Sequence, residues 1–257
     1  MTKRWLFPLM VILIVAVTGI SWWMLDPHQA EPVYQGKPES YWVELVANMR
    51  GRDFKKNWED LGTNGLPVLL KAVERKSNPI RTAYRKAWPK MPAWVKSRWR
   101  RPSDDSQIRT NALVLLSNWG DSKALLPLLK AHKNPLVRDA AANGLVSNAD
   151  NMVTLGLIEA LNDQDPRVRE SAAFAMCLDA REDSIVTPAC MKHINDGDPK
   201  VRFFVAAAVY IRPDNRTQVL PVLVEGLKSK DPDIRFWAEL VLKDASPEEL
   251  KDAGINK

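Results

Sequence analysis

The sequence predicts an all-α protein: an α-solenoid of about five helix-pair repeats, preceded by one N-terminal transmembrane helix. The first observation is a short motif, Asp or Asn followed by Pro, one variable residue, Val or Ile, and Arg. Full copies begin at Asn134, Asp165, Asp198 and Asp231, and weaker copies at Asn78 and Asp105. The motif arginines are 28, 29, 31, 33 and 33 residues apart. A period of this size indicates stacked helical units that bury their apolar faces against one another.

Each residue of the motif suits the start of a helix. In the copy at 165–176, Asp165 is an N-cap whose side chain accepts a backbone N–H, and Pro166 occupies the first helical position, where its missing donor costs nothing. Val168 begins an apolar stripe that continues at helical spacing through Ala172, Ala175 and Met176. The motif therefore predicts the second helix of each pair.

A second column of prolines, at 67, 127, 188 and 221, marks the opening turns of the first helices. The two columns together predict helix pairs at 63–76/79–88, 122–132/135–146, 151–162/166–178, 184–195/199–210 and 216–229/232–243. A further helix at 106–118 follows an irregular basic segment, 89–104. Ser246 and Glu249 form a capping box that begins a short C-terminal helix.

These motifs resemble those of the HEAT-repeat family in its short-period bacterial form, over roughly residues 60–243. The lead-in around Tyr34, Gly36 and Lys37 is similar to that of bacterial membrane-anchored HEAT proteins. The resemblance implies a right-handed solenoid with a structural ladder, in which each motif arginine bonds an aspartate of an adjacent repeat. The ladder residues are Arg138, Asp165, Arg169, Asp198, Arg202, Asp231 and Arg235. The alternative is that the arginine column binds anions.

The N-terminal region predicts a membrane anchor. Residues 1–4 are a basic cytoplasmic end, 5–25 an uncharged apolar run long enough to cross a bilayer, 26–38 a proline-containing extended linker, and 39–257 the solenoid with its capping helices. Basic residues only on the N-terminal side predict an inner-membrane protein with its N-terminus inside and its solenoid exported. A cleaved signal peptide is the alternative, although Thr18 and Gly19 make a poor cleavage site.

Catalytic motifs are absent from the sequence. The three histidines are far apart, and no phosphate loop or nucleophile elbow occurs. Cys177 and Cys190 are too few for a disulfide framework and are expected to be buried and unpaired. We therefore expect no enzyme activity, no cofactor and no metal.

Residues 75–103 hold ten Lys or Arg and no Asp or Glu, while the whole chain has a net charge of +6. One interpretation is that its tryptophans fill the gap left by a missing helix and that its charges are merely solvated. The other is contact with an anionic membrane surface, for which lysine, arginine and tryptophan are suited. The candidates for that contact are Arg85, Lys86, Lys90, Trp94, Lys96, Arg98, Trp99, Arg100 and Arg101.

A candidate partner surface lies on the second helices, two positions after the motif Val or Ile. This column changes from acidic to aromatic along the array and contains Asp139, Glu170, Phe203 and Phe236. The alternative is that the two rings fold over their own repeats as core.

The function predicted from these features is a non-enzymatic protein-interaction scaffold at the outer face of the cytoplasmic membrane, with an unknown protein partner. A nucleic-acid-binding or base-repair protein of the HEAT type is one alternative, suggested by the isoelectric point near 9.3. A phycobilin-lyase-like HEAT enzyme is the other. An exported domain disfavours both, and no nucleic acid is expected as a partner.

Overall fold

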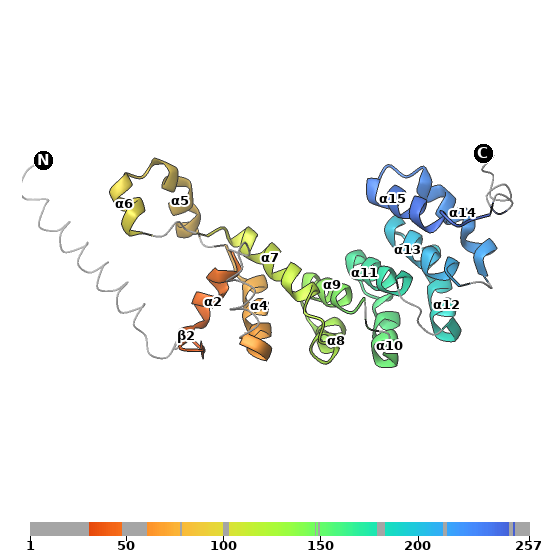
Figure 1. Ribbon diagram of the computed structural model, residues 1–257, viewed down its shortest axis with the longest axis horizontal. Coiled ribbons are helices and arrows are strands. Elements are labelled where there is room, and N and C mark those ends of the chain that lie inside the picture. The colour runs from red at the N-terminus through yellow and green to blue at the C-terminus, as the bar shows by residue number, and fades with distance from the viewer. Residues whose placement is uncertain are drawn as a thin grey trace, which may run out of the picture.

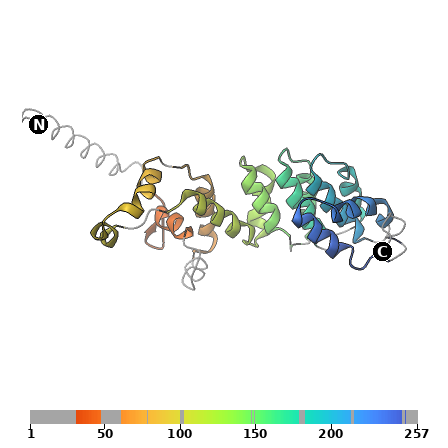
Figure 2. The same ribbon diagram turned by 90° about the horizontal axis from the view of Figure 1, so that it is seen from above.

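The computed structural model describes residues 31–47, 61–77, 79–99, 103–146, 148, 150–178, 183–212, 215–246 and 249. Its helices form an elongated array that advances from the N-terminal to the C-terminal end of the molecule (Figures 1 and 2). A short hairpin pairs β1 (Val33–Tyr34) with β2 (Lys37–Pro38). The helices are α2 (Glu39–Val46), η2 (Gly62–Asn64), α4 (Gly65–Glu74), α5 (Pro79–Ala87), η3 (Trp88–Lys90), α6 (Ala93–Arg98), α7 (Asp105–Ser117), α8 (Ser122–Ala131), α9 (Pro135–Gly144), α10 (Asn151–Ala160), α11 (Pro166–Cys177), α12 (Asp183–Lys192), α13 (Pro199–Tyr210), α14 (Arg216–Leu227) and α15 (Pro232–Val241).

The central repeats are antiparallel pairs arranged in two layers. The first helices α8, α10 and α12 lie on one side of the array, and the second helices α9, α11 and α13 lie on the other (Figure 1). Neighbouring second helices pack directly, α9 on α11 and α11 on α13. Alanines at their contacts are fully buried, for example Ala141, Ala173 and Ala206, and allow this close approach. This arrangement fits the predicted α-solenoid.

Each of the four full copies of the motif begins a helix, as predicted from its N-cap residue and proline. The side chains of Asn134, Asp165, Asp198 and Asp231 each accept a backbone N–H from the first turn of α9, α11, α13 and α15. The apolar stripe of α11, from Val168 to Met176, is fully buried. The predicted capping box is confirmed by reciprocal bonds, Ser246 N to Glu249 Oε2 at 2.8 Å and Glu249 N to Ser246 Oγ at 3.1 Å.

The predicted pair 63–76/79–88 was wrong. Helix α4 packs against α7, not against α5, and α5 buries none of its residues. Ile80, in the position of the motif aliphatic residue, is 80% exposed, whereas Ile108 of α7 is fully buried. The described residues between Glu74 and Asp105 are therefore an insertion between the two helices of the first repeat. The pair α4/α7 is the first of five helix pairs among the residues that the structure describes.

The end of the predicted extended linker, 26–38, is folded. Gln35 and Gly36 both have positive φ, 50° and 70°, which is the backbone of a tight hairpin turn. The indole Nε1 of Trp42 donates to the carbonyl of Tyr34 at 3.1 Å and joins the hairpin to α2. No helix among the described residues has the length and apolar character needed to cross a bilayer. The predicted span, 5–25, lies outside those residues.

Candidate binding groove on the second helices

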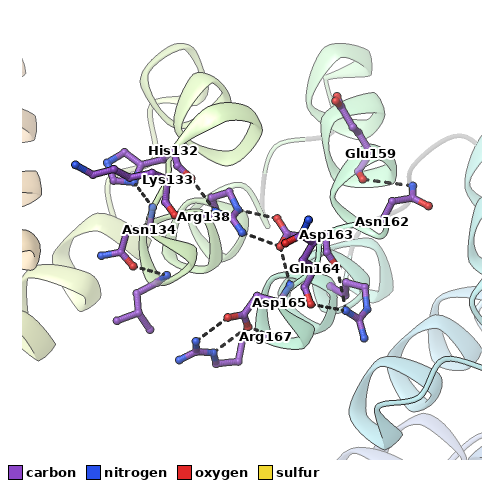
Figure 3. Close-up of polar contacts among 12 residues, drawn as sticks. His132, Lys133, Asn134, Arg138, Glu159, Asn162, Asp163, Gln164, Asp165 and Arg167 are labelled. Carbon is purple, nitrogen blue, oxygen red and sulfur yellow. Dashed lines mark hydrogen bonds and ion pairs between the residues drawn. The ribbon is translucent and has the colours of Figure 1, made fainter.

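Arginine–aspartate pairs join neighbouring repeats, and Figure 3 shows the one between Arg138 and Asp163. Arg138 on α9 donates to both carboxylate oxygens of Asp163, Nε to Oδ2 at 2.7 Å and Nη2 to Oδ1 at 2.8 Å. Arg169 on α11 holds Asp196 in the same way, at 2.9 and 2.8 Å. Each of these arginines also donates Nη1 to a backbone carbonyl six residues earlier in its own repeat. The ladder implied by the resemblance therefore exists at two junctions.

The aspartates assigned to the ladder were the wrong ones. Asp165 and Asp198 cap their own helices, and the guanidinium partners are the residues two positions earlier, Asp163 and Asp196. A carboxylate at the N-cap is turned toward the backbone N–H groups of its helix. The carboxylate two positions earlier faces the preceding repeat, and one of its oxygens accepts the N–H of the N-cap residue.

These pairs lower the pKa of their carboxyl groups. Hydrogen bonding from Arg138 holds the pKa of Asp163 below its ordinary value, against the opposing effect of burial. Burial raises the pKa of Asp196, but the bonds from Arg169 and the Asp198 N–H, with the guanidinium charge, outweigh it and lower the pKa. Both carboxylates are therefore ionised partners at neutral pH, as a structural ladder requires.

The ladder does not continue between α13 and the repeat formed by α14 and α15. The position two residues before the N-cap, where Asp163 and Asp196 lie in the earlier repeats, is Ser229 there. The Ser229 hydroxyl still accepts the N–H of Asp231 at 3.2 Å. Among the described residues no carboxylate pairs with Arg202 or Arg235. Each of these two arginines instead donates to a backbone carbonyl of its own repeat, at 2.7 and 2.6 Å. The predicted ion pairs of Arg202 and Arg235 with ladder aspartates were wrong.

A groove runs along the second helices on α9, α11, α13 and α15. It encloses about 350 Å³. Its lining combines carboxylates, two cations and aromatic rings from four successive repeats: Asp139, Asn143, Arg167, Glu170, Ser171, Phe174, Lys200, Phe204, Asp233, Ile234 and Trp237. Asp139 and Glu170 were predicted as partner-surface residues, and the structure brings both to this groove. Their role in binding stays a prediction.

Asp139 lies at the α9 end of the groove in a polar cluster. It accepts a short hydrogen bond from the Ser171 hydroxyl, and Asn143 Nδ2 donates to Ser171 Oγ at 2.8 Å and to Asp139 Oδ1 at 3.2 Å. No cation is paired with this carboxylate among the described residues. Burial raises the pKa of Asp139, and the Ser171 bond offsets this only in part.

Glu170 and Lys200 occupy the middle of the groove. Lys200 Nζ lies 3.8 Å from Glu170 Oε1, 3.2 Å from Asp231 Oδ2 and 3.7 Å from Asp233 Oδ2. Burial raises the pKa of Glu170, and Lys200 opposes this shift while neighbouring carboxylates add to it. Three carboxylates therefore share one ammonium group, so the negative charges outnumber the positive charge at the centre of the groove.

Aromatic rings form the wall beside these charges. Phe174, Phe204 and Trp237 come from α11, α13 and α15 and meet edge to face, with centroids 5.1 to 6.2 Å apart. The predicted column two positions after the motif aliphatic residue missed all three. Phe204 and Trp237 lie one position further along their helices, and Phe174 lies four positions further.

Phe203 was wrong as a partner-surface residue, because it is 2% exposed. Its ring packs on Gly226 of α14, so closely that a Cβ added there would lie 2.8 Å from Phe203 Cε2. Phe236, in the same motif position, is 60% exposed and does not line the groove. Among the described residues no further repeat follows α15 to bury that ring, which meets Trp237 edge to face at 5.7 Å.

The basic residues predicted in the segment 75–104 are of two kinds, those that are ion-paired to the solenoid and those that are not. Three arginines at its base are ion-paired: Arg75 and Arg81 with Glu44 and Asp105, and Arg85 with Asp104. Trp94 and Trp99 do not fill a gap in the array, since they are 65% and 63% exposed. Arg100 and Arg101 lie outside the described residues.

Cys177 and Cys190 are buried and unpaired, as predicted. Burial raises the pKa of the Cys177 thiol to about 11 and that of Cys190 to about 12. Among the described residues no group of three or more His, Cys, Asp or Glu side chains is arranged to hold a metal ion.

One comparison with known proteins supports the repeat assignment. Residues 154–243 match the family model of HEAT repeats, a stretch that contains the second ladder pair and most of the groove. No curated protein sequence matches the chain. A solved structure with similarity is the crystal structure of an engineered protein, a Northeast Structural Genomics Consortium target, 17% identical over 83% of this chain and 97% of that one, with a TM-score of 0.38. The similarity to HEAT repeats thus covers part of the C-terminal half of the chain, from α10 to α15.

Proposed function

We propose that the protein is a non-enzymatic interaction scaffold whose groove on α9, α11, α13 and α15 receives a segment of a protein partner. HEAT repeats commonly mediate protein interactions, and the matched stretch includes α11, α13 and α15. The observation that carries the proposal is the composition of the groove. Partly buried carboxylates stand beside three edge-to-face rings in a concave surface of about 350 Å³.

The chemistry of the groove favours a partner segment with a Lys or Arg next to an apolar side chain. A cation between Asp139 and Glu170 would pair with Asp139 and would add to the one ammonium that Glu170 shares with Asp231 and Asp233. Both contacts would be charge-assisted hydrogen bonds. An adjacent apolar or guanidinium group would pack on the wall of Phe174 and Trp237. The acidic lining disfavours a nucleic acid, because phosphates would face Asp139, Glu170 and Asp233.

A photo-reactive amino acid at Asp233, which is exposed and lines the groove, tests this proposal in the full-length chain in its native membrane fraction. The matched control carries the same group at Glu239, which is exposed on the same helix α15 but outside the groove. We expect a discrete protein adduct from position 233 and not from 239. Glu170→Gln combined with Asp139→Asn should reduce that adduct at least fivefold. Equal adducts from both positions, or adducts that survive the double substitution, would contradict the proposal.

We also propose that the solenoid is held at the outer face of a cytoplasmic membrane by residues 5–25. This rests on the uncharged apolar run and on Lys3 and Arg4 before it. Gln29→Cys should react with an impermeant maleimide added to intact cells. Cys177 and Cys190 give little background because both thiols are buried and have raised pKa values. Labelling only after lysis would contradict this location.

A further inference from the structure

A second surface lies far from the groove, on the basic insert, which we define as residues 79–99. It comprises α5, η3 and α6, and none of these helices buries a residue. Figures 1 and 2 show α5 and α6 at the N-terminal end of the molecule, apart from the stacked helix pairs. Helices with no buried side chain gain little from packing on the array, so the insert is not explained as part of the solenoid core.

The base of the insert is fixed to the solenoid by ion pairs. Arg81 Nη1 lies 2.8 Å from Glu44 of α2 and 3.4 Å from Asp105 of α7. Arg85 pairs with Asp104 at the start of α7. These contacts neutralise the acidic groups that face the insert, and they orient its far end away from the repeats.

The far end keeps its positive charge. Among the described residues no carboxylate pairs with Lys86, Lys90, Lys96 or Arg98. The Lys96 ammonium donates to the carbonyl of Pro89 at 3.0 Å, which closes η3 onto α6. The segment 86–99 therefore carries four cations and no acidic residue.

Two tryptophans accompany these charges, Trp94 in α6 and Trp99 directly after it. Trp94 and Trp99 are 65% and 63% exposed, although an indole in water forfeits the large apolar area it would gain by burial. Indoles are favourable at the boundary between water and lipid, where the ring meets acyl chains and the N–H stays hydrated. Cations that flank such rings are attracted to anionic headgroups.

We propose that the basic insert docks on a bilayer surface containing anionic lipid, with Trp94 and Trp99 at the headgroup level and Lys86, Lys90 and Arg98 around them. The contact is independent of the groove, which is built from α9 to α15. It gives the elongated molecule a second membrane contact besides the proposed anchor. Two contacts together fix the orientation of the helix array relative to the bilayer.

The test uses the full-length chain in bilayer discs, with an environment-sensitive fluorophore on Ser97→Cys. Ser97 is exposed on α6 between the two indoles. The control carries the label on Glu239→Cys at the other end of the molecule. We expect a blue shift of the Ser97 label in discs with phosphatidylglycerol, little shift in phosphatidylcholine discs, and none at position 239. Raising the salt to about 0.5 M should remove most of the shift, because it shortens the Debye length below the usual 8–10 Å.

Two variants separate charge from aromatic contact. Lys86→Gln/Lys90→Gln/Arg98→Gln should lower the ratio of docked to free insert at least tenfold. The matched control, Lys228→Gln/Lys230→Gln/Lys243→Gln, removes three exposed charges near α14 and α15 and should change nothing. Trp94→Ser/Trp99→Ser should also weaken docking, with the melting temperature unchanged because neither ring is buried.

Several outcomes would overturn the proposal. These are an equal shift with neutral lipid, a shift that persists in high salt, or one that survives the triple Gln variant. A shift produced by single-stranded RNA but not by anionic discs would assign the insert to nucleic acid instead. Because the groove is unchanged in every variant, loss of docking leaves the partner adduct at Asp233 intact, and the two proposals fail separately.

Discussion

The junctions α9–α11 and α11–α13 are held differently from the junction that follows them. The first two have a bidentate arginine–aspartate pair, Arg138 with Asp163 and Arg169 with Asp196. At the next junction Ser229 replaces the aspartate, and the buried ring of Phe203 packs on Gly226. There α13 packs mainly on α14 and touches α15 little. Neighbouring repeats can thus be joined by a bidentate arginine–aspartate pair, or by a buried ring together with the contacts of Lys200 to Asp231 and Asp233.

Phe203→Ala should have the largest effect on this comparison, because it removes the buried ring. Truncating a fully buried phenylalanine should lower the free energy of unfolding by about 3–5 kcal/mol, from lost burial and the cavity left behind. Phe236→Ala is the matched control in the next repeat. It should cost less than about 1 kcal/mol, because that ring is mostly exposed. Urea unfolding followed by circular dichroism measures both, and equal losses would break the distinction between the two rings.

Asp196→Ala tests the ion-paired junction. It removes both acceptors of Arg169 and the acceptor of the Asp198 N–H, so we expect a loss of about 1.5–3 kcal/mol. Ser229→Ala, at the equivalent position of the next junction, removes one neutral hydrogen bond and should cost about 0.5–1 kcal/mol. A loss for Ser229→Ala as large as that for Asp196→Ala would show that the ion pair adds nothing.

Acid should weaken the ion-paired junctions selectively. Asp163 and Asp196 have lowered pKa values in the folded state, so their contribution is present above the unfolded pKa of about 3.9 and is lost as the pH falls through the folded values. The melting temperatures of the wild type and of the variant Asp163→Asn/Asp196→Asn should therefore be compared from pH 7 to pH 2. The wild-type value should approach that of the variant only below about pH 4. A constant difference across this range would mean that the carboxylates do not act through their charge.

Asp139→Asn should give the smallest effect, and with the opposite sign. Burial raises the folded pKa of Asp139, so its favourable contribution is present below the unfolded pKa and is lost as the pH rises through the folded pKa. At neutral pH the ionised group then costs stability, and the substitution should stabilise the protein by about 0.5 kcal/mol, since the site is partly solvated. Asp244→Asn, at an exposed position, is the control and should be neutral. Destabilisation by Asp139→Asn would show that the charge supports the fold.

Most of the regular array could be predicted from the sequence, because its signals are local. Asp165 and Pro166 act within one turn of the helix they begin, and the stripe from Val168 to Met176 needs only the helical period. The groove could be predicted only in part. Asp139 and Glu170 were found from their motif position, whereas Phe174, Phe204 and Trp237 were missed because they reach the groove from other positions on their helices.

The sequence by itself determined where the helices of the repeats start, that they stack in pairs, and that residues 75–103 are basic and irregular. The tertiary structure decided which helices pair: α5 begins at Pro79 of a weaker motif copy, but α7 has the buried stripe that packs on α4. It also decided that Arg169 bonds Asp196 rather than the N-cap Asp198, and that Phe203 is covered while Phe236 is not. Such outcomes depend on what a neighbouring repeat presents at a given position, and a periodic local motif is nearly the same in every repeat.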